Sequence, residues 1–203
     1  MQITYLGHCC FKIRDKNVAL LTDPASPKAA GFTIPKTEAD IVTISHHDLV
    51  HDDLTRLKNE PFVIDAPGEY ELKGVSVVGL PAGQAGLPGD AASVVFLIEM
   101  EGLRVCHLSN LSHLLTDKEL EDLDGVDVLL VSVGQADKKG LSVEEIVKLI
   151  NQIEPSVVVP MRYTAAELDE FLKEYGSEGE KMEKLVVSKG GLGEETKVII
   201  LQK

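Results

Sequence analysis

The first half of the chain is patterned as a series of short β-strands. Short runs of apolar and β-branched residues are separated by glycine, proline and polar turn residues. Near the N-terminus the breaks between these runs are short, which predicts an antiparallel meander. The run over residues 40–45 is continuous and β-branched, as in a strand that is buried on both faces. Strands are expected at residues 3–6, 10–13, 18–22, 40–45, 62–64, 75–78, 93–99 and 103–107.

The second half of the chain alternates helical and strand patterns. Two of the helical patterns begin with a hydroxyl residue followed three positions later by glutamate, at Thr116 with Glu119 and at Ser142 with Glu145, which predicts capping boxes. A strand-rich half followed by a βαβα half favours an α/β architecture with sheets stacked between helices. Helices are expected at residues 116–123, 142–153 and 164–175, and strands at 126–133, 157–160, 185–188 and 197–201.

The composition indicates a folded protein rather than a disordered or membrane-spanning one. The chain has 203 residues, 44% of them hydrophobic, which is enough apolar material for one domain over residues 1–203. Its formal net charge of −13 repels the phosphate backbone, so we expect no nucleic-acid partner. No apolar run approaches the roughly 18 to 20 residues of a membrane helix, and no signal-peptide pattern is present. We therefore expect a cytoplasmic protein with no membrane partner.

Two local features add to this description. The chain contains three cysteines, two of them adjacent, which is a poor basis for a disulfide framework. We expect Cys9, Cys10 and Cys106 to be buried thiols in a reducing compartment. The segment from Pro81 to Gly89 is rich in glycine and proline, and we expect it to be a mobile loop in a position where a lid over a cleft could form.

Histidines gather where predicted strands end. His46, His47 and His51 follow one buried strand, and His107 ends another. Ligand sites of open α/β sheets lie at this edge, and imidazole is a common zinc ligand, so the cluster indicates a metal site.

A structural role for the same segment remains open. Asp48 could cap a helix over residues 50–57, with Asp52 and Asp53 near the positive end of its dipole. We expect the other two histidines, His8 and His113, to be hydrogen-bonded packing residues.

Several motifs together resemble the metallo-β-lactamase superfamily, specifically its small prokaryotic metal-dependent hydrolase branch. The resemblance extends over nearly the whole chain. It implies a four-layer αββα sandwich with a metal site at one edge of the two sheets. The motifs that carry it are Leu-Gly-His-Cys-Cys-Phe at residues 6–11, Leu-Thr-Asp-Pro at 21–24, Asp-Ile-Val-Thr-Ile-Ser-His at 40–46, Pro-Gly-Glu-Tyr-Glu at 67–71, Val-Cys-His-Leu at 105–108 and Val-Pro-Met at 159–161.

The metal-binding motif that this resemblance implies is degenerate. The family pattern His-x-His-x-Asp-His falls on residues 46–51, where His46 and His51 match, whereas Asp48 replaces a histidine and Val50 replaces the aspartate. The later histidine is kept as His107.

Two further ligand positions of the family are altered. Asn110 replaces an aspartate that bridges both metals, and Arg162 replaces a final histidine after Pro-Met. Four of the seven implied ligand positions therefore differ from the family pattern.

These changes affect the two implied metal positions unequally. His46, Asp48 and His107 still make a competent three-ligand set for one zinc or similar divalent ion. At the second position only His51 is a good ligand, because Asn110 is a weak one and Arg162 carries a permanent positive charge. We expect no dinuclear centre and regard His51, Asn110 and Arg162 as the remnant of the second site. Arg162 has two open interpretations, which are a salt bridge to Asp48 or another acid and an anion-binding group.

Two functional hypotheses follow from the altered motif. The favoured one is a protein of this fold with a degraded dinuclear site, inactive or weakly metal-binding, whose cleft serves for binding an unknown small molecule or has no ligand. The alternative is a mononuclear zinc-dependent hydrolase of an ester, amide or phosphoester. Neither hypothesis specifies a catalytic residue or an oligomeric state.

Overall fold

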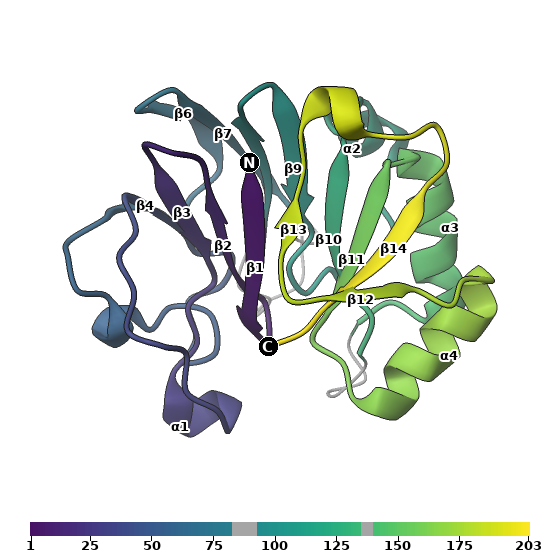
Figure 1. Cartoon of the computed structure of the whole chain (residues 1–203), viewed down its shortest axis with the longest axis horizontal. Helices are drawn as coiled ribbons and strands as arrows, with labels where there is room; N and C mark the ends of the chain where they lie inside the picture. Colours follow the sequence, from purple (N-terminus) through teal and green to yellow (C-terminus); the bar gives the residue numbers. More distant parts are fainter. Residues whose placement is uncertain (83–92, 135–139) are drawn as a thin grey trace.

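The computed structural model describes residues 1–82, 93–134 and 140–203, which form two β-sheets packed face to face (Figure 1). Helices cover the outer face of the larger sheet, as the predicted four-layer αββα sandwich requires on that side. Most of the predicted lid segment, residues 83–89, lies outside the described residues. None of the helices in the described ranges has both the length and the apolar character needed to span a bilayer.

The smaller sheet has six strands in the order β13-β1-β2-β3-β4-β5. Strands β1, β2 and β3 pair antiparallel, which confirms the predicted N-terminal meander. Strands β3, β4 and β5 pair in parallel, so their C-terminal ends lie at one edge. The bounds are β1 (Gln2–Gly7), β2 (Cys10–Arg14), β3 (Ala19–Thr22), β4 (Ile41–Thr43), β5 (Phe62–Ile64) and β13 (Leu185–Val186).

The larger sheet has eight strands in the order β12-β14-β11-β10-β9-β8-β7-β6. Neighbouring strands among β9, β10, β11 and β14 pair in parallel. Neighbouring strands from β6 to β9 pair antiparallel, so β9 has one neighbour of each kind. The two edge strands, β6 and β12, were not predicted, because their charged residues do not form an apolar run. The bounds are β6 (Gly68–Leu72), β7 (Val75–Pro81), β8 (Val94–Met100), β9 (Leu103–His107), β10 (Val128–Ser132), β11 (Val157–Met161), β12 (Glu180–Met182) and β14 (Lys197–Leu201).

The predicted capping boxes set the starts of the helices. The hydroxyls of Thr116 and Ser142 accept from the backbone N–H of Glu119 and Glu145, as predicted, and a third box begins at Thr164. The helices are α1 (Pro27–Ala30), α2 (Asp117–Asp122), α3 (Val143–Ile153) and α4 (Ala165–Tyr175), with 3₁₀ turns η1 (Leu54–Arg56) and η2 (Lys189–Gly191).

The alternative in which Asp48 caps a helix over residues 50–57 is wrong. This segment contains a turn followed by η1, and the residue that caps η1 is Asp53, which accepts from the N–H of Thr55. The carboxylate of Asp48 instead accepts from the N–H of Val50 and contacts the ring of His51. Such local side-chain bonds compete with helix formation, which explains the turn.

The main core lies between the two sheets and holds the fully buried Phe11, Phe96 and Ile98. A second apolar cluster packs α2, α3 and α4 onto the outer face of the larger sheet. On the outer face of the smaller sheet the covering layer is thinner, because it consists mainly of loop and turn between β3 and β5. All three cysteines are buried free thiols, as predicted. The packed sheets leave one edge at which the ends of several strands meet.

Candidate functional site

The site is built from chain segments that follow strands of both sheets. His46 follows β4 and Asp23 follows β3 in the smaller sheet, whereas His107 ends β9 and Arg162 follows β11 in the larger one. The tight turn between β1 and β2 adds His8. Hydrogen bonds across this edge, described below, bring these segments together in space.

Four residues of this edge adopt left-handed backbone conformations although none is glycine. The φ angles are 56° at His8, 37° at Asp23, 52° at Ser109 and 53° at Arg162. Each such residue costs of order 1 kcal/mol or more, so the surrounding contacts must hold it in place. Strain of this kind concentrates at functional sites, which supports a role for this edge.

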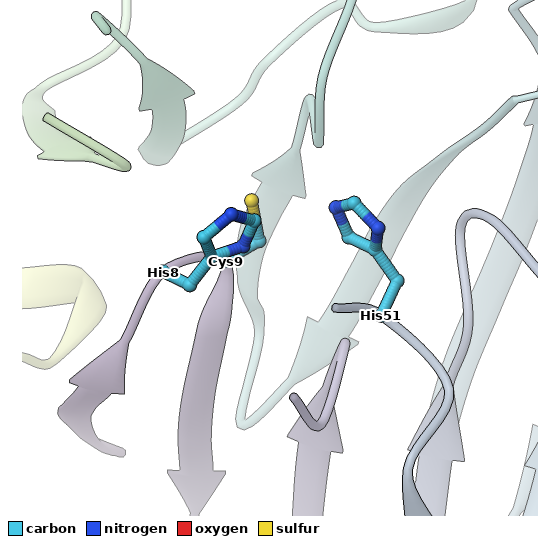
Figure 2. Close-up of side chains that lie close together, drawn as sticks. All are labelled: His8, Cys9 and His51. Atoms are coloured by element: carbon cyan, nitrogen blue, oxygen red, sulfur yellow. The ribbon is translucent and has the colours of Figure 1, made fainter. Parts of the chain in front are cut away.

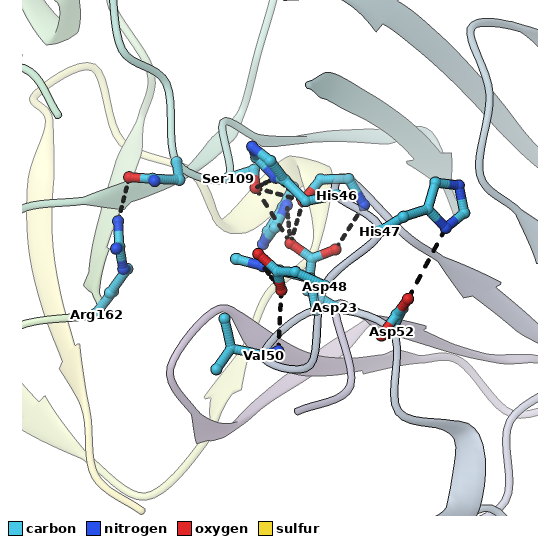
Figure 3. Close-up of polar contacts among 12 residues, drawn as sticks. Asp23, His46, His47, Asp48, Val50, Asp52, Ser109 and Arg162 are labelled. Atoms are coloured by element: carbon cyan, nitrogen blue, oxygen red, sulfur yellow. Dashed lines mark hydrogen bonds and ion pairs between the residues drawn. The ribbon is translucent and has the colours of Figure 1, made fainter. Parts of the chain in front are cut away.

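Asp23 is the centre of the polar network and is completely buried. Its carboxylate accepts from the N–H of Ser45 at 2.7 Å, from the hydroxyl of Ser45 at 2.6 Å and from that of Ser109 at 3.2 Å (Figure 3). Burial raises the pKa of Asp23 to about 6, although these hydrogen bonds and His51 oppose the rise. A role for Asp23 was not predicted, and the one signal for it in the sequence is a carboxylate directly after a buried strand.

This network orients the ring of His46. The Nδ1 atom of His46 lies 3.0 Å from the hydroxyl oxygen of Ser45 and 3.4 Å from that of Ser109. Its ring centroid lies 4.9 Å from that of His51. Burial lowers the pKa of His46, and the positive charge of Arg162 contributes to the same effect. The ring is therefore neutral near pH 7.

His107 links the two sheets and keeps one ring nitrogen unused. Its Nε2 donates a 2.9 Å hydrogen bond to the carbonyl oxygen of Cys9. That bond assigns the proton to Nε2 and leaves a lone pair on Nδ1. This Nδ1 atom is buried, lies 3.9 Å from an oxygen of Asp23 and has no hydrogen-bond partner within residues 1–82, 93–134 and 140–203. Burial lowers the pKa of His107 to about 4, so its contact with Asp23 is not an ion pair near neutral pH.

Asp48 and His51 form a carboxylate–imidazole pair. The distance between Oδ1 of Asp48 and Nδ1 of His51 is 2.7 Å. Burial acts to raise the pKa of Asp48, but His51 and the hydrogen bonds outweigh it and hold that pKa below its ordinary value. His51 is 2% exposed, and its Nε2 is buried with no hydrogen-bond partner in the part of the chain that the structure describes. A carboxylate in this position fixes the tautomer of an imidazole that binds a metal through its other nitrogen.

The arrangement of possible metal ligands differs from the set that the sequence favoured. Among the described residues, the one group whose ligand atoms all lie within 4.8 Å of one another is His8, Cys9 and His51 (Figure 2). His46, Asp48 and His107 reach the same edge but do not form such a group in this structure. Their assignment as the ligands of a single metal ion stays a prediction.

His8 and Cys9 were not identified as site residues. We expected His8 and His113 to be hydrogen-bonded packing residues. In both, the Nδ1 atom is buried and has no partner among the residues that the structure describes, so the expectation is wrong for these atoms. The His8 ring lies 5.3 Å from that of His51. His47 has an exposed side chain between Asp52 and Asp65, at 3.9 Å and 3.6 Å, and is not part of the site.

The remnant of the second metal position contains the positively charged guanidinium of Arg162. A guanidinium nitrogen of Arg162 donates a hydrogen bond to the side-chain oxygen of Asn110 (Figure 3). The positive charge of Arg162 also contributes to lowering the pKa of His8, which burial brings to about 4. Val50 adds only an aliphatic side chain to this region.

A cavity of about 380 Å³ adjoins the site. Its lining includes the aromatic rings of Tyr5 and Phe32, the cationic side chains of Arg162 and Lys203, His8 and the acidic Glu167. The ammonium nitrogen of Lys203 lies 3.3 Å from the centroid of the Phe32 ring. Aromatic rings beside cationic groups suit a small molecule that has both apolar and anionic parts.

Comparisons with known proteins agree with this architecture. The family model described as Beta-lactamase superfamily domain matches residues 2–162. A UPF0173 protein from Pyrococcus furiosus is 30% identical over 194 residues, which covers 86% of this chain and 90% of that protein. A UPF0173 metal-dependent hydrolase from Archaeoglobus fulgidus is 23% identical over 228 residues, which covers 94% and 97% of the two chains. A crystal structure of a metallo-beta-lactamase superfamily protein from Thermotoga maritima has a TM-score of 0.82 and 32% identity, and the match covers 98% of this chain and 97% of that one.

Proposed function

The chain belongs to the metallo-β-lactamase superfamily, and we propose that it is a member without a two-metal hydrolytic centre. In this proposal it holds at most one metal ion and uses the cavity beside the strand ends to bind a small molecule. The cavity supports ligand binding by its size and by its aromatic and cationic lining.

The hydrogen bond between Arg162 and Asn110 carries the proposal. These residues stand where the resemblance places two ligands of the second metal ion, and here they pair with each other. A guanidinium stays protonated at all accessible pH values, so a second divalent cation beside it meets a permanent repulsion. Val50 offers no donor atom that could offset this cost.

A mononuclear metal-dependent hydrolase is the second candidate. It is favoured by buried ring nitrogens without hydrogen-bond partners, Nδ1 of His107 and Nε2 of His51, since such atoms suit a metal ion. These unused nitrogens suit one ion, although the set that the sequence predicts, His46, Asp48 and His107, shares only His107 with them. A bound zinc ion supplies Lewis-acid chemistry and a more acidic water molecule. The protein's own contribution is the Asp23 and Ser45 network, which holds the ring of His46 in place.

Metal counting tests the proposal. The protein is purified without an affinity tag, incubated with excess zinc, passed through a desalting column and measured by elemental analysis. We expect no more than one zinc ion per chain and no turnover of p-nitrophenyl esters or phosphodiesters. Two tightly held ions per chain would overturn the proposal. One ion together with chelator-sensitive turnover would support the second candidate instead.

A further inference from the structure

We infer that His8, Cys9 and His51 form a binding site for a single zinc-like metal ion, with Asp48 as the residue that positions His51. This site differs from the predicted set of His46, Asp48 and His107. The inference rests on the proposed function only in that the chain holds one ion rather than two.

The geometry brings three different donor atoms to one point. His8 and Cys9 come from the turn between β1 and β2, and His51 approaches from the loop after β4 (Figure 2). Their ligand atoms lie within 4.8 Å of one another. Around a tetrahedral zinc ion such atoms are separated by about 3.5 Å, given metal–ligand distances of roughly 2.0 to 2.3 Å. To bind one ion, the three ligand atoms would therefore have to move about 1 Å closer to one another.

Two of the imidazole nitrogens have no other use in the fold. Nε2 of His51 and Nδ1 of His8 are both buried, and neither has a hydrogen-bond partner among the described residues. A buried polar atom in this state costs free energy, and a metal ion would remove that cost. Because Nδ1 of His51 bonds to Asp48, the lone pair of His51 is on Nε2, the atom that faces Cys9 and His8.

The donor chemistry selects the class of metal. One thiolate and two imidazoles suit zinc and other borderline or soft ions, whereas magnesium and calcium prefer oxygen ligands. Cys9 is a completely buried free thiol, and burial raises its pKa, so the metal ion would have to displace the thiol proton to solvent as the metal–sulfur bond forms.

The surroundings complete and moderate the site. The ring of His46 lies 4.9 Å from that of His51, but His46 does not belong to the group of close ligand atoms, so a water molecule would take the fourth position. Arg162 opposes a cation here, since its charge also lowers the pKa of His8, whereas the Asp48 carboxylate favours the cation. The competition between these charges makes the site weaker than a closed structural zinc site.

Cobalt substitution tests the site independently of any activity. Cobalt(II) bound by a thiolate gives an intense sulfur-to-metal charge-transfer band, so titration of the full-length protein reports both stoichiometry and sulfur ligation. We expect one equivalent to bind with this band. Cys9→Ser should abolish the band and weaken binding at least tenfold. The matched control variants are Cys10→Ser and Cys106→Ser, which change other buried free thiols and should retain the band.

Two more variants keep the test decisive if Cys9→Ser folds poorly. His8→Asn keeps a residue that tolerates the left-handed backbone and should also weaken binding at least tenfold. Asp48→Asn should weaken binding about 10- to 100-fold with the band retained, because it acts through His51. A band that survives Cys9→Ser, binding lost only in His46→Ala, or no cobalt or zinc bound at millimolar concentration would overturn the inference. Two bound equivalents would instead overturn the proposed function.

Discussion

Nε2 of His107 donates a hydrogen bond of 2.9 Å to the carbonyl oxygen of Cys9 and joins the end of β9 to the turn between β1 and β2. Both residues are completely buried. We expect His107→Leu to lower the free energy of unfolding by about 2 to 4 kcal/mol, because it leaves a buried carbonyl without its donor and alters packing. Urea denaturation measures this loss. His47→Ala, at an exposed side chain, should change stability by no more than about 0.5 kcal/mol, and equal effects of the two variants would contradict the prediction.

Acidification should destabilise the protein. Burial lowers the pKa values of His8 and His107 from 6.5 to about 4 and lowers that of His46 as well. Between these values the unfolded chain binds more protons than the fold, so stability falls as pH drops from 6.5 towards 4. For the completely buried His107 the full effect is about 3 kcal/mol.

Asp23 acts in the opposite direction within part of this range. Its raised pKa of about 6 means that the fold binds a proton more readily than the unfolded chain, which stabilises the fold at low pH and is lost as pH rises through 6. Asp23→Asn removes this compensation, so its stability should fall more steeply between pH 6.5 and 4.5 than that of the wild type. Thermal unfolding at several pH values checks both slopes. A wild type that gains stability on acidification would refute the assignment.

Restoring the altered ligand positions should restore the second metal position. We expect Val50→Asp combined with Asn110→Asp and Arg162→His to raise the zinc content from at most one ion to two per chain, because it removes a fixed cation and adds two carboxylates and an imidazole. Elemental analysis after desalting gives the count. Arg162→Lys retains the charge and should leave the count unchanged. If the triple variant folds and still holds no additional ion, the alignment of these positions with the family motif is wrong.

Gly134 lies against the backbone of Arg162. A Cβ atom at Gly134 would lie 2.0 Å from the carbonyl oxygen of Arg162. Arg162 itself already has a left-handed backbone, with a φ of 53°. We expect Gly134→Ala to cost about 2 to 3 kcal/mol of stability and to displace Arg162. Chemical denaturation provides the measurement. Gly190→Ala is the control, because no atom lies within 4 Å of its Cβ position, and it should be nearly neutral.

The parts of the fold that sequence analysis predicted correctly are those encoded locally. Apolar runs marked most strands, and the capping boxes at Thr116 and Ser142 marked two helix starts, because each signal extends over only a few residues. The edge strands β6 and β12 were missed since their backbones pair without an apolar run. The helix over residues 50–57 was wrong because the carboxylate of Asp48 stabilises a turn instead.

The site was predicted in outline but not in its contacts. The resemblance identified the strand ends that meet, including His46, His107 and Arg162. The proximity of His8 and Cys9 to His51 joins segments about 40 residues apart in sequence, which no local pattern encodes. The same is true of Asp23, which contacts Ser109 across the two sheets.

The guanidinium of Arg162, held by Asn110, gives this edge a charge that is part of the polypeptide. A metal cofactor must be acquired after synthesis and can be withdrawn by competing chelators. Arg162 is present as soon as the chain has folded, so its charge does not depend on metal supply. An anionic ligand drawn to this edge would therefore meet this positive charge in metal-starved and in metal-replete cells alike.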